Sequence, residues 1–253
     1  HHQQDRSFVR MVINQCKAIV LSMQAVRRIN PASKYVHTDD GGTVFSTPAL
    51  AYQATFENHR RDLALDLLFG RVDSAHPLCD YLLNNGVTFA ELEWFAAQDV
   101  TPDTIGIDYY ATSDRYLDHR VALYPPPTLG GNGVHRYADV AAAGNMSGWS
   151  AGFSEALQRT GVQYDRPVAL TEIHLGCTRE EQLRWMDAAW RGARVAASQG
   201  VAVKAVTSWA LFGSFDWDQL ATTNNGHYEP GAFDLRGPAP RRTAIGAAVE
   251  SIA

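Results

Sequence analysis

The pattern of apolar and polar residues is most informative toward the C-terminal end of the chain, where continuous apolar runs occupy residues 168–175 and 205–212. A strand inside a parallel sheet is covered on both faces and is typically such a run, so we predict two buried strands here. Between the runs, residues 179–199 place apolar side chains at the spacing of an amphipathic helix. Strand, helix and strand in this order form a right-handed crossover unit of a parallel sheet.

Alternating helices and strands are predicted along the rest of the chain. Apolar residues at helical spacing indicate a long helix over residues 7–30, which Asn30 and Pro31 end. Thr47 and Pro48 open a second long helix that runs to about residue 69. Shorter helices are predicted over residues 77–84, 89–97, 150–160 and 243–252, further strands over 34–38 and 104–110, and loops over 123–145 and 226–240.

The number of predicted core strands is small for the length of the chain. Four are evident, near residues 34–38, 104–110, 168–174 and 203–209. An eight-stranded barrel needs eight strands and typically about 250 residues. The chain has 253 residues, but long helices and loops occupy much of it, and its first element is a helix. Four parallel strands alone expose two sheet edges, so we expect an α/β fold that amounts to half a barrel or more.

Candidate chemistry lies where these strands end. Glu172 is close to the carboxyl end of the strand at 168–174, the place where barrel enzymes carry their catalytic groups. Tyr110 and Trp209 end two other strands. Glu172 has an alternative interpretation as a structural carboxylate that pairs with an arginine. The two aromatic residues have an alternative place in the hydrophobic core, where large aromatic side chains contribute most of their energy.

Three motifs resemble, in order and spacing, those of family 1 glycoside hydrolases. They are GIDYY at residues 106–110, TEIH at 171–174 and WALFGSFDW at 209–217. The resemblance extends over about residues 7–253 and is strongest to the divergent barrel domains of dTDP-4-dehydrorhamnose reductase fusion proteins. It implies a (β/α)8 TIM-barrel type of fold of which about strands 5–8 are evident. It also implies one glycosidase-like domain over residues 1–253 that lacks the N-terminal strands.

The resemblance implies a retaining β-glycosidase of the β-glucosidase type, which acts on O-glycosidic bonds. Glu172 then corresponds to the nucleophile, and Tyr110 is the second catalytic residue, which orients it. The substrate-binding residues implied by the motifs are Asp108, His174, Trp209, Asp216 and Trp217. The chain departs from the family pattern in three places: Asp108 replaces an asparagine, Ile173 and His174 replace Asn-Gly, and Asp216 replaces a glutamate.

The acid/base residue of the family has no counterpart in this sequence. Retaining glycosidases need two carboxyl groups about 5–5.5 Å apart, and the N-E-P motif that supplies one of them does not occur here. By position, Asp39 and Asp40 are the nearest substitutes within the chain, and a partner subunit is another possible source. The alternative function is a carbohydrate-binding or scaffold barrel without catalytic activity.

Composition narrows the remaining function classes. The net charge of −5 and the absence of a basic stripe give no indication of a nucleic-acid partner. No apolar stretch reaches the roughly 18–20 residues that a membrane span needs, and no G-x-G-x-x-G motif indicates a nucleotide-binding reductase. The three cysteines form no C-x-x-C pair, which favours a reducing, cytoplasmic location without a disulfide framework.

Ligand and partner expectations follow from these features. No cofactor is expected. His37, Asp39 and Asp40 do not have a known metal-ligand spacing, so we interpret them as a loop cap and expect no metal. The expected ligand is a small carbohydrate or glycoside. Self-association that completes the barrel is expected through the strands near 34–38 and 203–209.

Overall fold

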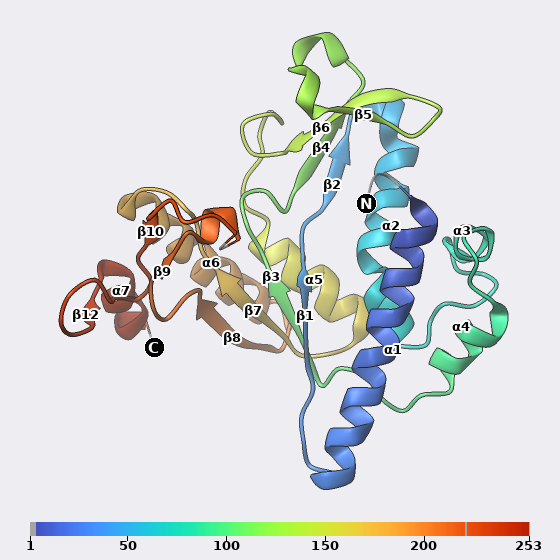
Figure 1. Ribbon diagram of the computed structural model, residues 1–253, viewed down its shortest axis with the longest axis horizontal. Helices are drawn as coiled ribbons and strands as arrows, with labels where there is room; N and C mark the ends of the chain where they lie inside the picture. The colour runs from blue at the N-terminus through green and yellow to red at the C-terminus, as the bar shows by residue number, and fades with distance from the viewer. Residues whose placement is uncertain (1–3, 221, 253) are drawn as a thin grey trace. The chain divides into compact units, whose positions relative to one another are not determined.

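The structure is a computed structural model that describes residues 4–220 and 222–252, and the chain divides into two compact units (Figure 1). The first unit contains the residues up to His37, together with Thr43–Asp103 and Tyr116–Val140. The second contains Thr38–Gly42, Thr104–Arg115 and the described residues from Ala141 onward. The single domain over residues 1–253 stays a prediction.

Helices dominate the first unit. They are α1 (Asp5–Ile29), α2 (Ala51–Leu68), α3 (Cys79–Asn84) and α4 (Phe89–Ala96), with short 3-10 turns at Pro48–Leu50, Val121–Leu123 and Pro126–Thr128. The predicted long helix is confirmed as α1, which buries Val9, Ile13 and Val20 on one face. That face packs in one core with Leu63 and Leu67 of α2. Apolar residues that recur every three or four positions form the buried stripe of such a helix, and this spacing is recognisable in the sequence.

A second sheet, which belongs to the first unit apart from Arg115 and Ala141, was not predicted. Its strands are β2 (Val44–Ser46), β4 (Arg115–Asp118), β6 (Arg136–Ala141) and β5 (Leu129–Gly131), in that order. The loop prediction for residues 123–145 is therefore wrong, because β5 and β6 pair there as an antiparallel hairpin. β5 has only three residues, and the prolines and glycines around this hairpin are typical of loops.

The main sheet has the strand order β1-β3-β7-β8 and belongs to the second unit, apart from the first two residues of β1. Its strands are β1 (Val36–Asp40), β3 (Thr104–Asp108), β7 (Val168–Ile173) and β8 (Val203–Ser208). The ladders β3–β7 and β7–β8 are parallel. The four predicted core strands and the α/β fold class are thus confirmed.

Two helices pack on this sheet within the second unit (Figure 1): α5 (Phe153–Tyr164) contacts β3 and β7, and α6 (Arg179–Ser198) contacts β7 and β8. Both were predicted from their periodicity. The ring of Phe153 lies 4.8 Å from that of Tyr109 and 4.9 Å from that of Trp185, measured between centroids. This aromatic cluster joins both helices to the residue that follows β3.

β8 differs from its prediction as a buried strand. It is an edge strand of the sheet, and Lys204, Ala205 and Thr207 are exposed. The apolar run continues into Leu211 and Phe212, which are also exposed. Burial of both faces requires a neighbouring strand and a covering layer, and no described strand pairs with the free edge of β8.

The C-terminal segment of the second unit contains little regular secondary structure. It contains β9 (Ser214–Phe215), a 3-10 turn at Trp217–Gln219, β10 (Tyr228–Glu229), β11 (Phe233–Asp234), β12 (Arg241–Arg242) and α7 (Ala244–Ile252). The predicted loop at 226–240 therefore contains two two-residue strands, which pair with β9 and β12. Among the described helices, none combines the length and apolar character needed to cross a membrane.

Candidate active site at the carboxyl ends of the sheet strands

The parallel pairing of β3 and β7 brings the predicted nucleophile, Glu172, beside the predicted substrate-binding residue Asp108 at the carboxyl ends of the two strands. Asp108, the last residue of β3, is the register partner of Glu172, the penultimate residue of β7. The register shifts between Ile107 and Asp108, so that both Thr171 and Glu172 lie opposite Asp108. Such a bulge redirects side chains near functional sites.

Glu172 and Tyr110 are in direct contact. The Tyr110 hydroxyl donates a hydrogen bond to Oε2 of Glu172. Burial raises the pKa of Tyr110 above its ordinary range, and the hydrogen bond to Glu172 raises it further. The phenol therefore keeps its proton at neutral pH and acts as a fixed donor. Both residues are partly buried.

Asp108 lies in an acidic environment. Its Oδ1 accepts a hydrogen bond from the Thr171 hydroxyl at 2.7 Å. Burial raises the pKa of Asp108; the Thr171 bond opposes this, and the charges of Glu172, Asp39 and Asp40 add to the rise. The group is therefore more easily protonated than an ordinary aspartate.

The last two residues of β1, Asp39 and Asp40, bring two further carboxylates to the carboxyl end of the sheet. Oδ1 of Asp40 accepts from the Gly42 amide at 2.9 Å, and its Oδ2 accepts from the Ser113 hydroxyl at 2.6 Å. Oδ1 of Asp39 accepts from the Asp40 amide at 2.9 Å. These bonds have the form of a loop cap. At Gly41, a Cβ atom would stand 2.2 Å from Cγ2 of Ile107, so only glycine fits this close approach.

Trp209 lies on the other side of β7. Its backbone amide donates to the Ile173 carbonyl at 3.1 Å, between Glu172 and His174. The Trp209 ring lies 5.2 Å from that of His174 and 5.3 Å from that of Trp217, centroid to centroid. Trp217 is 45% exposed. The three rings form an aromatic wall next to the Glu172 strand, which is the type of surface on which a sugar ring packs.

Asp216 is placed differently from the other predicted residues. It is buried, and both of its oxygens accept backbone hydrogen bonds, from the His227 amide at 2.9 Å and the Gly226 amide at 3.3 Å. The carboxylate therefore ties the segment before Trp217 to the segment that leads into β10. Its assignment to sugar binding stays a prediction.

Glu229 of β10 lies in the segment that was predicted as a loop over residues 226–240, and its carboxylate is close to the predicted site residue His174. Its Oε2 lies 3.4 Å from Nε2 of His174, and its Oε1 lies 3.9 Å from Nε2 of His227. Its side chain is only 17% exposed. The one signal in the sequence is a charged residue between a tyrosine and a proline in a glycine-rich segment, and that pattern is also typical of an exposed loop.

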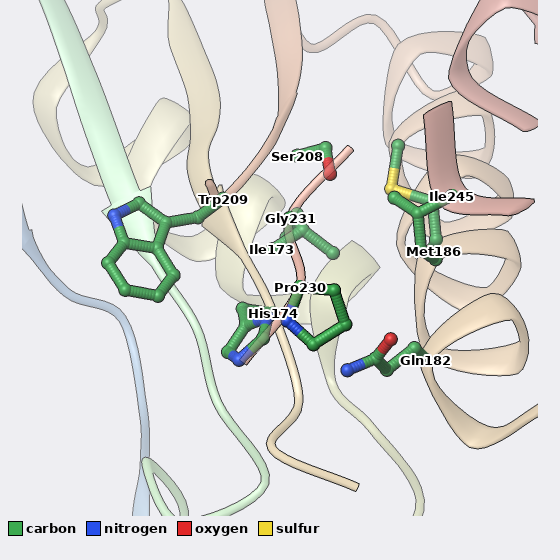
Figure 2. A pocket seen from close by; sticks show the side chains of 9 residues that line it. All are labelled: Ile173, His174, Gln182, Met186, Ser208, Trp209, Pro230, Gly231 and Ile245. Atoms are coloured by element: carbon green, nitrogen blue, oxygen red, sulfur yellow. The ribbon is translucent and has the colours of Figure 1, made fainter. Parts of the chain in front are cut away.

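A narrow pocket lies beside His174 (Figure 2). Figure 2 shows the Trp209 indole on one side of the strand ends, and Met186 of α6 with Ile245 of α7 on the other. His174 and Pro230 lie between them. Gln182 lines the same pocket and donates to the Leu175 carbonyl at 3.0 Å. Within residues 4–220 and 222–252, no group of three or more histidine, cysteine, aspartate or glutamate residues is arranged to hold a metal ion.

Comparison with known proteins shows the fold. No family model matches the chain, and no curated protein matches it. Among solved structures, it is similar to a family 1 β-glucosidase from Thermotoga maritima, with a TM-score of 0.72 and 14% sequence identity. The complex of a β-glucosidase from the same organism with deoxynojirimycin gives a TM-score of 0.70 at 14% identity, and the complex with cyclophellitol gives 0.70 at 13%.

These alignments cover 99% of this chain and 57% of the other chain. The chain therefore spans a little over half the length of these β-glucosidases. Such a match at low identity confirms a glycosidase-like α/β fold, present as part of a TIM barrel. Activity, substrate and site residues are separate questions, because one barrel fold supports many reactions.

Proposed function

We propose that this protein is a retaining β-glycosidase of the β-glucosidase type, with Glu172 as its nucleophile and a small glycoside as its ligand. The observation that supports this most directly is the hydrogen bond from Tyr110 to Glu172 at the carboxyl end of β7. Among the described residues, Tyr110 is the one donor to this carboxylate. It fixes Oε2 and leaves Oε1 to react.

In the proposed reaction, Oε1 of Glu172 attacks the anomeric carbon and the bond to the leaving oxygen breaks. A second carboxyl group protonates that oxygen, and a water molecule then hydrolyses the glycosyl–enzyme ester. Trp209 and Trp217 offer ring faces to the sugar, and His174 lies at the same wall. Asp108 and Asp216 complete the proposed substrate-binding set.

The second carboxyl group is the open part of this mechanism. Asp39 and Asp40 lie near enough for their charges to raise the pKa of Asp108. Oδ1 of Asp40 accepts from the Gly42 amide and its Oδ2 from the Ser113 hydroxyl, while Oδ1 of Asp39 accepts from the Asp40 amide. Asp39 and Asp40 are therefore our two candidates within the chain for the acid/base residue.

Self-association belongs to the same proposal. β1 and β8 are the two edge strands of the main sheet, and β8 exposes apolar and polar residues alike. A second copy that paired with these edges would cover the open strands, in line with the common two-fold arrangement of homo-oligomers. The closer likeness to the barrel domains of reductase fusion proteins also stays a proposal.

The decisive test uses two ligands seen with the similar β-glucosidases. Cyclophellitol is an epoxide, and we expect it to add once to the wild-type chain, on Glu172, as measured by intact mass and peptide mapping. Glu172→Gln should give no adduct and should lower kcat on an aryl β-glucoside by several orders of magnitude. Glu93→Gln, at an exposed position of α4, is the matched control and should behave as wild type.

The outcomes separate the two functional classes. Turnover that depends on Glu172 supports the glycosidase. Deoxynojirimycin binding by calorimetry, without turnover or cyclophellitol labelling, would instead favour a carbohydrate-binding barrel. A Glu172→Gln variant with wild-type turnover would contradict the nucleophile assignment.

A further inference from the structure

A carboxylate of β10 lies against the histidine that follows β7. Oε2 of Glu229 is 3.4 Å from Nε2 of His174, and the two side chains are only 17% and 12% exposed. Nε2 of His174 is buried and makes no hydrogen bond with the described residues. The carboxylate oxygen would repel a lone pair on Nε2, so this contact favours the form of the imidazole that carries a proton on Nε2.

The backbone around Glu229 holds its side chain in this place. Glu229 is the register partner of Ser214 in the antiparallel pair β9–β10. The Asp216 amide donates to the His227 carbonyl at 2.7 Å, and the Asp216 carboxylate accepts from the His227 amide at 2.9 Å. At Gly176, a Cβ atom would stand 2.9 Å from Oε1 of Glu229, so the glycine leaves room for the carboxylate beside the segment that follows β7. The position of Glu229 is therefore set by the β9–β10 pair and not by its contact with His174.

The ring of His174 joins this carboxylate to the aromatic wall. Its centroid lies 5.2 Å from that of Trp209, with an angle of 64° between the ring planes. His174 and Pro230, the residue after Glu229, both line the pocket in Figure 2. Because Nε2 is buried, the exposed part of the His174 side chain lies elsewhere. The contact at Nε2 therefore fixes the ring from its covered side and leaves its other side to a ligand.

We propose that Glu229 is a positioning residue that fixes His174 with its proton on Nε2, so that Nδ1 is the acceptor for a hydroxyl group of the sugar. This inference rests on the proposed function for the nature of the ligand. A neutral imidazole has one donor and one acceptor nitrogen. A carboxylate that holds the proton on one nitrogen therefore determines what the other nitrogen can bind, as carboxylates do for histidines that bind metals.

Two substitutions of Glu229 and one of a neighbour test this role. Glu229→Ala removes the carboxylate, whereas Glu229→Gln keeps a carbonyl oxygen that can accept a hydrogen bond from Nε2 of His174. His227→Gln is the matched control. His227 is exposed, and its Nε2 lies 3.9 Å from the other carboxylate oxygen, Oε1 of Glu229. This control leaves the contact between Glu229 and His174 in place and should behave as wild type.

Nitrogen-15 NMR of the full chain shows which ring nitrogen carries the proton. Spectra are recorded at increasing pH until the imidazole shifts stop changing, and His174→Asn identifies the His174 signals. His174 should have a protonated Nε2 in wild type and in Glu229→Gln, and shifts averaged between the two neutral forms in Glu229→Ala. His76 is an internal reference that should not change, because its Nδ1 accepts from the Leu78 amide at 3.1 Å and its Nε2 lies 3.2 Å from Oδ2 of Asp66. A protonated Nδ1 or averaged shifts in wild-type His174, or wild-type shifts in Glu229→Ala, would overturn the proposal.

Sugar binding gives the second readout. On an aryl β-glucoside, Glu229→Ala should raise KM about 3- to 10-fold, the size expected for one hydrogen bond between neutral groups, and should change kcat little. Glu229→Gln should keep KM within about twofold of wild type. A loss confined to kcat, or the same rise in KM in both variants, would contradict the positioning role. If wild type has no glycosidase activity, the proposed function fails, while the NMR comparison and the affinity for glucose by calorimetry still decide the role of Glu229.

Discussion

Replacement of Tyr110 with phenylalanine removes the hydrogen bond to Glu172 and keeps the aromatic ring. A hydrogen bond to a charged group contributes about 1.5–3 kcal/mol. Because 1.36 kcal/mol corresponds to a tenfold change in rate, we expect kcat/KM on an aryl β-glucoside to fall roughly 10- to 150-fold. The fall should be mainly in kcat, since the phenol contacts the proposed nucleophile and positions it for attack.

A matched control exists in the first unit. The Tyr124 hydroxyl donates to Oδ2 of the buried Asp118 at 2.9 Å, so Tyr124→Phe makes the same chemical change at another carboxylate. This variant should lose stability but keep kcat/KM. If Tyr110→Phe keeps kcat/KM within about threefold of wild type while Glu172→Gln is inactive, the phenol does not position the nucleophile and our reasoning is wrong.

Two further predictions concern stability and assembly. Glu91 contacts Arg10 at 2.6 Å and Lys17 at 3.1 Å, and the hydrogen bond from Arg10 is the main cause that lowers its pKa to about 2. A carboxyl group whose pKa is lower in the folded state stabilises the fold at pH values above its unfolded-state pKa of about 4.3. The melting temperature of Glu91→Gln should therefore lie below that of wild type at pH 7, and the two should converge near pH 2. A difference in melting temperature that does not change with pH would contradict this. For assembly, light scattering should give twice the mass of one chain, and a stable monomer that binds no hydrophobic dye would refute self-association through β1 and β8.

The elements that were predicted correctly are those whose own sequence carries the periodic signal. α1 and α6 each bury one stripe of residues, and β7 is a continuous apolar run that is buried as expected. The start of α6 is also explicit in sequence, because Thr178 and Glu181 form a reciprocal capping box. Such local signals do not depend on the rest of the fold.

The features that were missed depend on neighbours that are distant in sequence. The apolar residues of β8 predicted a buried strand, but β8 is an edge strand and is partly exposed. Its burial depends on whether a further strand pairs with it, which its own sequence does not show. The hairpin β5–β6 lies in a segment rich in proline and glycine, and these turn residues predict a loop where the two strands pair. The contact of Glu229 with His174 joins residues 55 positions apart, which no local pattern shows (229 − 174 = 55).

The charge of the site bears on which glycosides suit it. Asp39, Asp40, Asp108 and Glu172 are all acidic and interact electrostatically at one edge of the sheet. An anionic sugar, such as a uronic acid or a sugar phosphate, would meet repulsion there, because like charges brought together at a binding site are costly. Neutral glycosides avoid this cost, and a protonated amine such as deoxynojirimycin is attracted.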